Sequence, residues 1–160
     1  MKKKGLALFV AMAIAFWGFQ GASMCVLAEE TIAAEGEDLD FSYFTEENSL
    51  VGYASVPRGV YLASGDSHIS KISSYKIGVG GITNAAVRCD VSVTLIVERY
   101  NMQKDVWQSI TSWQQENENA FSAAISKSLI VDCGYYYRVR CLHYAETDSS
   151  SSYTNALYVN

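Results

Sequence analysis

Three side chains in the second half of the chain could do chemistry together. Cys141 and His143 stand two residues apart, and Cys89 is a second thiol on another alternating segment. Thiolate and imidazole groups are ligands that suit zinc and copper, so a hydrolase or metal-binding enzyme centred on these three residues is one hypothesis. No fourth ligand stands nearby, and a single Cys-x-His pair is a weak pattern. We therefore expect neither a metal nor another cofactor.

Other catalytic patterns are matched only by composition. A serine hydrolase needs a serine, a histidine and a carboxylate in contact. His143, Asp148 and the serines at 149–152 are close in sequence, but a serine run is typical of a flexible loop. The glycine-rich residues 78–81 lack the strand–turn–helix context of a phosphate loop. The acids are scattered singly among lysines and arginines, so no carboxylate pair suggests a glycosidase. We predict no catalytic residues and a protein that is not an enzyme.

The elements that would position these groups are β-strands. Residues 135–145 alternate strictly, and side chains alternate across a strand, so this segment predicts one buried and one solvated face. The buried face would carry Tyr135, Tyr137, Val139, Cys141, His143 and Ala145, and the solvated face Tyr136, Arg138, Arg140, Leu142 and Tyr144. Residues 87–98 alternate in the same way and predict a second central strand.

The remaining chain after residue 49 divides into short β-rich runs with turn chemistry between them. Polar or glycine-rich segments predict breaks at 64–67, 80–81, 101–105, 114–119, 132–134 and 147–152. A last strand is expected at 153–158. No stretch in this part of the chain repeats at helical spacing. The pattern favours an all-β fold, an antiparallel β-sandwich.

Two segments resemble strands of fibronectin type III domains, which are immunoglobulin-like sandwiches. Residues 134–141 are similar to the penultimate strand. The resemblance makes Tyr135 the tyrosine corner, whose hydroxyl bonds back to upstream backbone. Residues 93–100, followed by 106–108, resemble the hairpin that begins with the third strand.

The same resemblance bears on the cysteines. It makes the two matched strands antiparallel neighbours, which would bring Cys89 beside Cys141 for a disulfide and leave Cys133 at the opposite end. The alternative is three buried thiols that act as small hydrophobic side chains.

A second resemblance covers most of the chain. The N-terminal segment and residues 50–53, 58–62, 71–73, 97–99 and 134–140 are similar to a family of small secreted proteins from Gram-positive anaerobes. That family is catalogued only as a domain of unknown function, so the resemblance implies secretion and brings no activity.

The N-terminus has the features of an export signal. Three lysines precede an apolar run from about Gly5 to Phe19, which is shorter than the ~20 residues of a membrane-spanning helix. We predict a signal peptide at 1–28, cleaved before Glu29, with no membrane span after cleavage. A lipoprotein would use Cys25, but Met24 fits badly before such a cysteine.

Charge divides the rest of the chain into a leader and a body. Residues 29–47 contain eight acids and no base. Residues 29–49 therefore predict an acidic, partly disordered leader before a sandwich domain at 50–160. From residue 48 onward nine lysines and arginines balance nine acids. A neutral body has no field that attracts phosphate, so we expect no nucleic-acid partner.

Aromatic side chains form the remaining candidate site. Tyr136 and Tyr144 are expected on the outer face, and Trp107 and Trp113 share a parity on the neighbouring strand. A row of these four could stack on sugar rings or anchor a surface protein. The alternatives are tryptophans that pack inward, or tyrosines that only cover arginine side chains. We expect a secreted or cell-wall-associated, non-catalytic binding module, and the sequence does not separate this role from that of a secreted toxin or inhibitor.

Overall fold

The computed structural model describes residues 49–55 and 59–160. The expected signal peptide with Cys25, and the acidic leader up to residue 48, lie outside the described residues. Within the described ranges every element of regular secondary structure is a β-strand. None of the described segments is a helix of the length and apolar character needed to cross a membrane.

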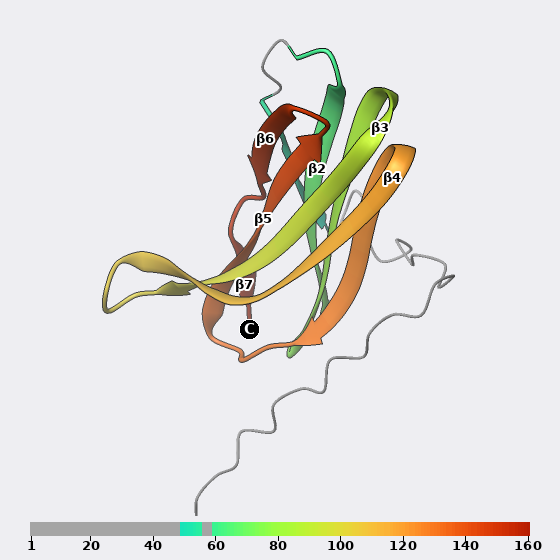
Figure 1. The fold of residues 1–160 in the computed structure, drawn as a ribbon. Coiled ribbons are helices and arrows are strands. Elements are labelled where there is room, and N and C mark those ends of the chain that lie inside the picture. Colours follow the sequence, from blue (N-terminus) through green and yellow to red (C-terminus); the bar gives the residue numbers. More distant parts are fainter. Residues whose placement is uncertain (1–48, 56–58) are drawn as a thin grey trace, which may run out of the picture. The chain divides into compact units, whose positions relative to one another are not determined.

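Seven antiparallel strands form one sheet that is folded on itself (Figure 1). They are β1 (Ser49–Tyr53), β2 (Leu62–Ser73), β3 (Lys76–Asn101), β4 (Val106–Ile130), β5 (Tyr135–Ala145), β6 (Asp148–Tyr153) and β7 (Leu157–Val159). Pairing follows the order β1-β2-β3-β5-β6, with β4 on β3 and β7 on β5. The expectation of an antiparallel all-β fold is confirmed.

Strands β3 and β4 make one long hairpin that serves both layers of the folded sheet. The first half of β3, from Lys76 to Ala85, pairs with β2, and its second half, from Val91 to Arg99, pairs with β5. Strand β4 follows β3 along both halves. Figure 1 shows both strands bending over together at the top of the view and then running back. As a result β2 packs against β5 and β6 without pairing with either.

Side chains hold the corner where the hairpin passes from one layer to the other. The β3–β4 register shifts on both sides of Cys89, as at a β-bulge. Arg88 Nη1 donates to the carbonyl oxygen of Asn119 at 3.1 Å, and the Asn119 N–H donates to Asp90 Oδ1 at 3.1 Å. Asn119 has a φ of 46°, a left-handed conformation that asparagine tolerates.

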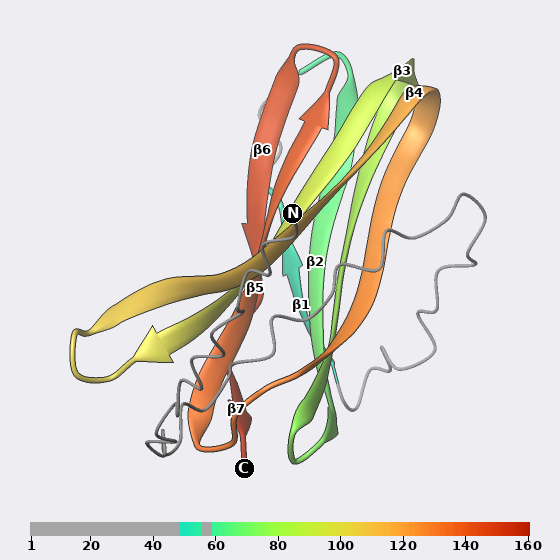
Figure 2. The same cartoon turned by 60° about the horizontal axis from the view of Figure 1, so that its bottom comes forward.

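The tip of the β3–β4 hairpin extends beyond the end of the pairing between β3 and β5. The last β3–β5 pair is Arg99 with Tyr137, so the residues nearer the tip pair only within the hairpin. Figures 1 and 2 both show this tip projecting away from the other strands. The Tyr100 and Trp107 rings lie 5.3 Å apart on it.

Several expected breaks are in fact paired strand residues. β2 runs through 64–67, β3 runs through 80–81, β4 runs through 114–119, and most of 147–152 belongs to β6. The predictions of turns or loops at these four places are wrong. Residue type alone misleads here. Glycine and small polar residues also occur inside paired strands, where the opposite layer of the sheet leaves no room for a larger side chain.

Two glycines show this close approach directly. A Cβ at Gly65 would lie 2.4 Å from the His143 ring, and a Cβ at Gly81 would lie 2.5 Å from Cys141 Sγ. Both positions therefore need glycine for space rather than for a turn. The side chains of β5 occupy the room that these glycines of the opposite layer leave.

The strand order departs from the immunoglobulin arrangement in one respect. In that arrangement the second strand pairs with the fifth, whereas here β2 pairs with the first half of β3. The part that resembles fibronectin type III domains keeps its expected neighbours, since the second half of β3 lies between β4 and β5.

The core is built from the inward faces of both layers. Its wholly buried side chains include Ile69, Ile77, Val79, Val91, Val93, Leu95, Val97, Tyr137, Val139, Cys141 and Val159. The face of β5 that alternation predicts to be buried is buried from Tyr137 to Ala145. Tyr135 is the exception, because it is 38% exposed at the end of the strand.

The tyrosine corner belongs to Tyr137 and not to Tyr135. The Tyr137 hydroxyl donates to the carbonyl oxygen of Asp132 at 2.9 Å, across the bend that precedes β5. The Tyr135 ring instead lies under the guanidinium of Arg99, at 4.6 Å. Both tyrosines share one parity, and the sequence could not tell which of them lies within the core.

Replacing Tyr137 by Phe should lower the free energy of unfolding by about 1–2 kcal/mol, because the buried ring loses its bond and the Asp132 carbonyl loses a donor. Tyr135→Phe is the matched control and should change the same quantity by less than about 0.5 kcal/mol. Urea unfolding of both variants measures the difference. Equal losses would contradict the assignment of the corner.

Candidate functional site

The three side chains considered for metal or thiol chemistry do not meet. Cys141 pairs with Leu95 and His143 pairs with Val93 in the β3–β5 ladder. Cys89 precedes Leu95 by six positions, which is about 20 Å of strand. A disulfide needs Cα atoms within about 7 Å. The Cys89–Cys141 bridge that the resemblance allowed is therefore not formed, and the three cysteines of the described residues are free.

The register explains this error. Strand β3 continues past the end of β5 into the corner, so Cys89 lies beyond the strand that the resemblance would place beside it. Cys141 is buried at its contact with Gly81, and burial raises the pKa of its thiol to about 12. Cys133 is exposed before the start of β5. In the part of the chain that the structure describes, no three His, Cys, Asp or Glu side chains group as metal ligands.

His143 instead forms the centre of a buried hydrogen-bond network. Its Nδ1 lies 2.8 Å from Thr83 Oγ1, and its Nε2 lies 2.8 Å from Ser152 Oγ. Thr83 Oγ1 donates its only proton to the Ser92 carbonyl oxygen at 3.0 Å. It must therefore accept a proton from Nδ1–H, which leaves Nε2 to accept the proton of Ser152. The geometry assigns the neutral Nδ1–H tautomer.

This network contains a serine–histidine pair but not an accessible one. His143 and Ser152 are each 1% exposed, and the third partner is Thr83 rather than a carboxylate. Asp148, the carboxylate near them in sequence, binds the backbone N–H groups of Tyr61 and Leu62 at 2.7 and 3.1 Å. Those bonds lower the pKa of Asp148. The arrangement joins β5, β6 and the opposite layer, and it exposes no nucleophile.

Sequence reasoning missed two members of this network. Thr83 and Gly65 carry no pattern that links them to His143, because they come from other strands. Ser152 is close to His143 in sequence, but the serine run predicts a flexible loop and not a buried partner. The one available signal is that His143 lies on the apolar face of an alternating strand. A histidine there needs partners for both of its nitrogens.

The outer face of the same sheet carries exposed aromatic side chains. Tyr136 and Tyr144 are 41% and 45% exposed on β5, and Tyr136 packs on Tyr158 of β7 with the rings 4.9 Å apart. Trp107 of β4 is partly buried and contacts the guanidinium of Arg138 at 4.3 Å. Three of the four predicted aromatic residues therefore lie on this face.

Trp113 does not share the face with Trp107. The β3–β4 register shifts at Ile110, an extra residue in β4 that reverses the parity of the strand. Trp107 lies opposite Tyr100, whereas Trp113 lies opposite Leu95 and packs against the core. The expectation that the two tryptophans share one side of the sheet is wrong for this reason.

Arg138 organises the charged end of the outer face. Its guanidinium lies over the Trp107 ring at 4.3 Å and over the Tyr153 ring at 5.2 Å. Its Nε donates to Glu98 Oε2 at 2.6 Å, and Arg140 Nε lies 3.5 Å from the other oxygen of that carboxylate. Glu98 is 6% exposed, so it is a buried carboxylate shared between two arginines. Both guanidinium groups are thus partly neutralised.

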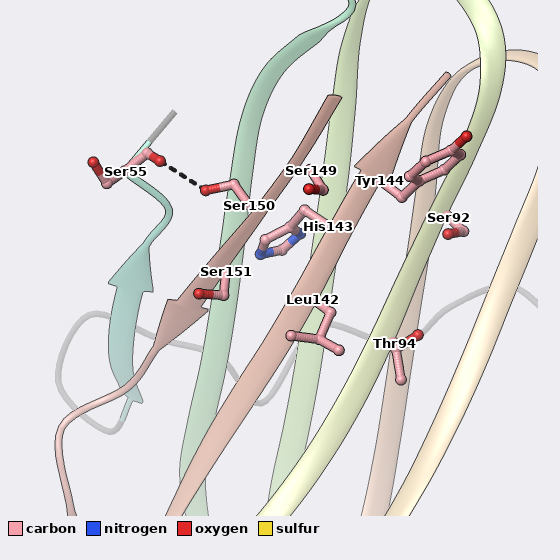
Figure 3. A pocket seen from close by; sticks show the side chains of 9 residues that line it. All are labelled: Ser55, Ser92, Thr94, Leu142, His143, Tyr144, Ser149, Ser150 and Ser151. Atoms are coloured by element: carbon pink, nitrogen blue, oxygen red, sulfur yellow. Dashed lines mark hydrogen bonds between the residues drawn. The ribbon is translucent and has the colours of Figure 1, made fainter. Parts of the chain in front are cut away.

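An open groove of about 640 Å³ lies at the other end of this face, over β3, β5 and β6 (Figure 3). It is lined by Ser55, Ser92, Thr94, Leu142, His143, Tyr144, Ser149, Ser150 and Ser151. Cross-strand pairing arranges most of these residues in two rows. One row is Ser92, Tyr144 and Ser149, and the other is Thr94, Leu142 and Ser151.

The β5–β6 hairpin that carries the groove is tied to the chain between β1 and β2. Ser150 Oγ donates to the carbonyl oxygen of Ser55 at 2.7 Å, the bond drawn in Figure 3. Two residues earlier on β6, Asp148 accepts hydrogen bonds from the backbone N–H groups of Tyr61 and Leu62, where β2 begins. The groove therefore has a fixed edge on the side of β6.

Comparison with known protein families adds membership but no activity. A family model matches residues 26–158. The chain belongs to DUF6147, a family of unknown function. The expected membership in a family with a domain of unknown function is confirmed. No protein with a curated description matches the chain.

Burial of His143 predicts how the stability of this DUF6147 member depends on pH. Burial lowers the pKa of His143 to about 4, from 6.5 in the unfolded chain. The unfolded chain therefore binds a proton first as the pH falls, and stability present above pH 6.5 is lost on the way to pH 4. Linkage gives a loss of about 2 kcal/mol between pH 7 and pH 5.

Urea unfolding at these two pH values measures that loss. His143→Gln should be less stable at pH 7 but should lose little further stability at pH 5. His68→Gln is the control and should keep most of the pH dependence, since His68 is only half-buried. An undiminished loss in His143→Gln would show that another group is responsible.

Proposed function

We propose that this protein is an exported, non-catalytic binding module that engages a component of a cell surface through the outer face of β3, β5 and β6. The observation that carries the proposal is the groove on that face. It combines a volume of about 640 Å³ with exposed hydroxyl groups and one exposed aromatic ring. An exposed aromatic side chain with polar groups around it is common at sites that bind partners.

The arrangement of the sheet supports a binding role. All residues of the groove except Ser55 come from three paired strands, so their backbone is fixed before any ligand arrives. A preformed surface lowers the ordering cost of association. The groove therefore needs no rearrangement to present its side chains.

The N-terminal sequence supports export. A basic start and a short apolar run precede residue 26, where the family match begins. A chain with these features in a Gram-positive cell would be secreted or held at the cell wall. A cell-surface component would then be the ligand that it meets first.

The alternative of a hydrolase or metal enzyme centred on Cys89, Cys141 and His143 receives no such support. Cys89 lies at the corner, and the imidazole is turned into the core. Ser152, the one serine bonded to that imidazole, is buried. We therefore propose no reaction for this chain.

Export is tested by expressing the full chain with a C-terminal tag in a Gram-positive host. We expect the tagged protein in the medium or the wall fraction, with Glu29 as its first residue, because the signal is removed during export. N-terminal sequencing of the purified protein checks the cleavage site. Retention in the cell with an intact Met1 would contradict the proposal.

Binding is tested with the exported protein and isolated cell envelopes. Tyr144→Ala should lower the bound fraction about fivefold, because it removes one aromatic contact with the ligand. Tyr75→Ala is the control, since Tyr75 is 59% exposed between β2 and β3 and away from the groove. Envelope binding that is absent, or equal in both variants, would count against a role of the outer face.

A further inference from the structure

The groove presents hydroxyl groups on both sides of an apolar strip. Leu142 and Tyr144, which are 43% and 45% exposed, occupy the middle strand. The flanking strands contribute Thr94 on one side and Ser149 and Ser151 on the other. Adjacent strands lie about 4.8 Å apart, so the Leu142 row places a hydroxyl on either side of a carbon surface. The Tyr144 row presents one on the β6 side only, because Ser92 is 7% exposed. Figure 3 shows the residues of both rows around the groove.

No side chain that lines the groove carries a charge at neutral pH. The lining consists of six serines and threonines, one leucine, one tyrosine and His143, which burial keeps neutral. Phosphate, sulfate or carboxylate ligands would need arginine or lysine there. A cationic ligand would need a carboxylate.

At the Leu142 end of the groove, the nearest charges on the face are already paired. Arg140 occupies the row next to Leu142 and lies 3.5 Å from Glu98 through its Nε. That carboxylate also binds Arg138 at 2.6 Å. An anionic ligand that reached this end of the groove would therefore compete with Glu98 for both guanidinium groups.

The chemistry of the groove matches a neutral sugar. A hydroxyl group both donates and accepts a hydrogen bond, as serine and threonine do, and a sugar ring also has an apolar face of C–H groups. The Tyr144 ring offers a surface on which that face can stack. An apolar ligand would leave the serine hydroxyls unpaired, and burying them unpaired is unfavourable.

We propose that the groove binds a neutral saccharide chain. Tyr144 stacks on one sugar ring, Leu142 covers the apolar face of the next position, and Thr94, Ser149 and Ser151 hydrogen-bond sugar hydroxyls. This inference rests on the proposed function and names the ligand class of the same site.

The test is a titration of the isotope-labelled exported protein with four hexasaccharides. Three are neutral, built from glucose, N-acetylglucosamine or mannose, and the fourth is an anionic galacturonic acid hexamer. At least one neutral probe should shift the backbone amide signals of residues 92–94, 142–144 and 149–151. The anionic probe should shift them less at the same concentration.

Two variants and a control make the assignment specific. Tyr144→Ala should raise the Kd of the neutral probe about tenfold, and Ser149→Ala should raise it about threefold, because each removes one contact of ordinary strength. Tyr158→Ala is the control, since its ring is as exposed as that of Tyr144, at 44%, but lies beside Tyr136 outside the groove. It should change the Kd less than about twofold. The amide spectrum of each variant shows that it is folded.

The outcomes separate this inference from the proposed function. Binding of the anionic probe alone, shifts outside the groove, or no response to any neutral probe would overturn the saccharide assignment. If Tyr144→Ala still weakens envelope binding in those cases, the binding role of the outer face stands and its ligand is of another class. If neither envelopes nor probes bind, both proposals fail.

Discussion

One buried imidazole ties the two layers of the sheet together, and much of the structure depends on that contact. His143 of β5 bonds Thr83 of the opposite layer and Ser152 of β6, and Gly65 leaves room for its ring. Burying an imidazole is unfavourable unless both nitrogens are paired. The two hydroxyls and the glycine must therefore occur together. This requirement explains why Gly65 stands in β2 and Thr83 in β3, where apolar core residues would otherwise be expected.

The same contact determines what the outer face presents. Leu142 and Tyr144 are the neighbours of His143 along β5, and alternation turns both toward solvent. A slip of the strand by one residue would expose the imidazole and bury the tyrosine. The register of β5 is therefore fixed from inside. The positions of Leu142 and Tyr144 in the groove are therefore fixed as well, because these residues are the neighbours of His143 on the same strand.

Alternation made the faces of β5 predictable from the sequence, and the buried face is as expected from Tyr137 onward. The pairing register of the strands and their close contacts with the opposite layer were not predictable, because both depend on residues in other strands. Period two holds only while a strand is regular, so the extra residue Ile110 turns Trp113 inward. Gly65 and Gly81 have the residue type of turns, and only the opposite layer reveals that they make room for a side chain. The groove itself depends on pairing across three strands, which no single segment encodes.

The two faces of β5 and β6 are the reason why we propose a binding role rather than catalysis. Ser152 and His143 form a nucleophile–base pair in composition, but both point inward, whereas Tyr144 and Ser151 point into the groove. His143 borders the groove, but its side chain lies on the inward face of β5 and the residue is 1% exposed, so a ligand in the groove meets Leu142 and Tyr144 rather than the imidazole nitrogens. Exposing the pair would require β5 and β6 to separate from β2, which would break the bond to Thr83 and open the core. Binding on the outer face requires none of this, because every group that it uses is already at least partly exposed on the folded sheet.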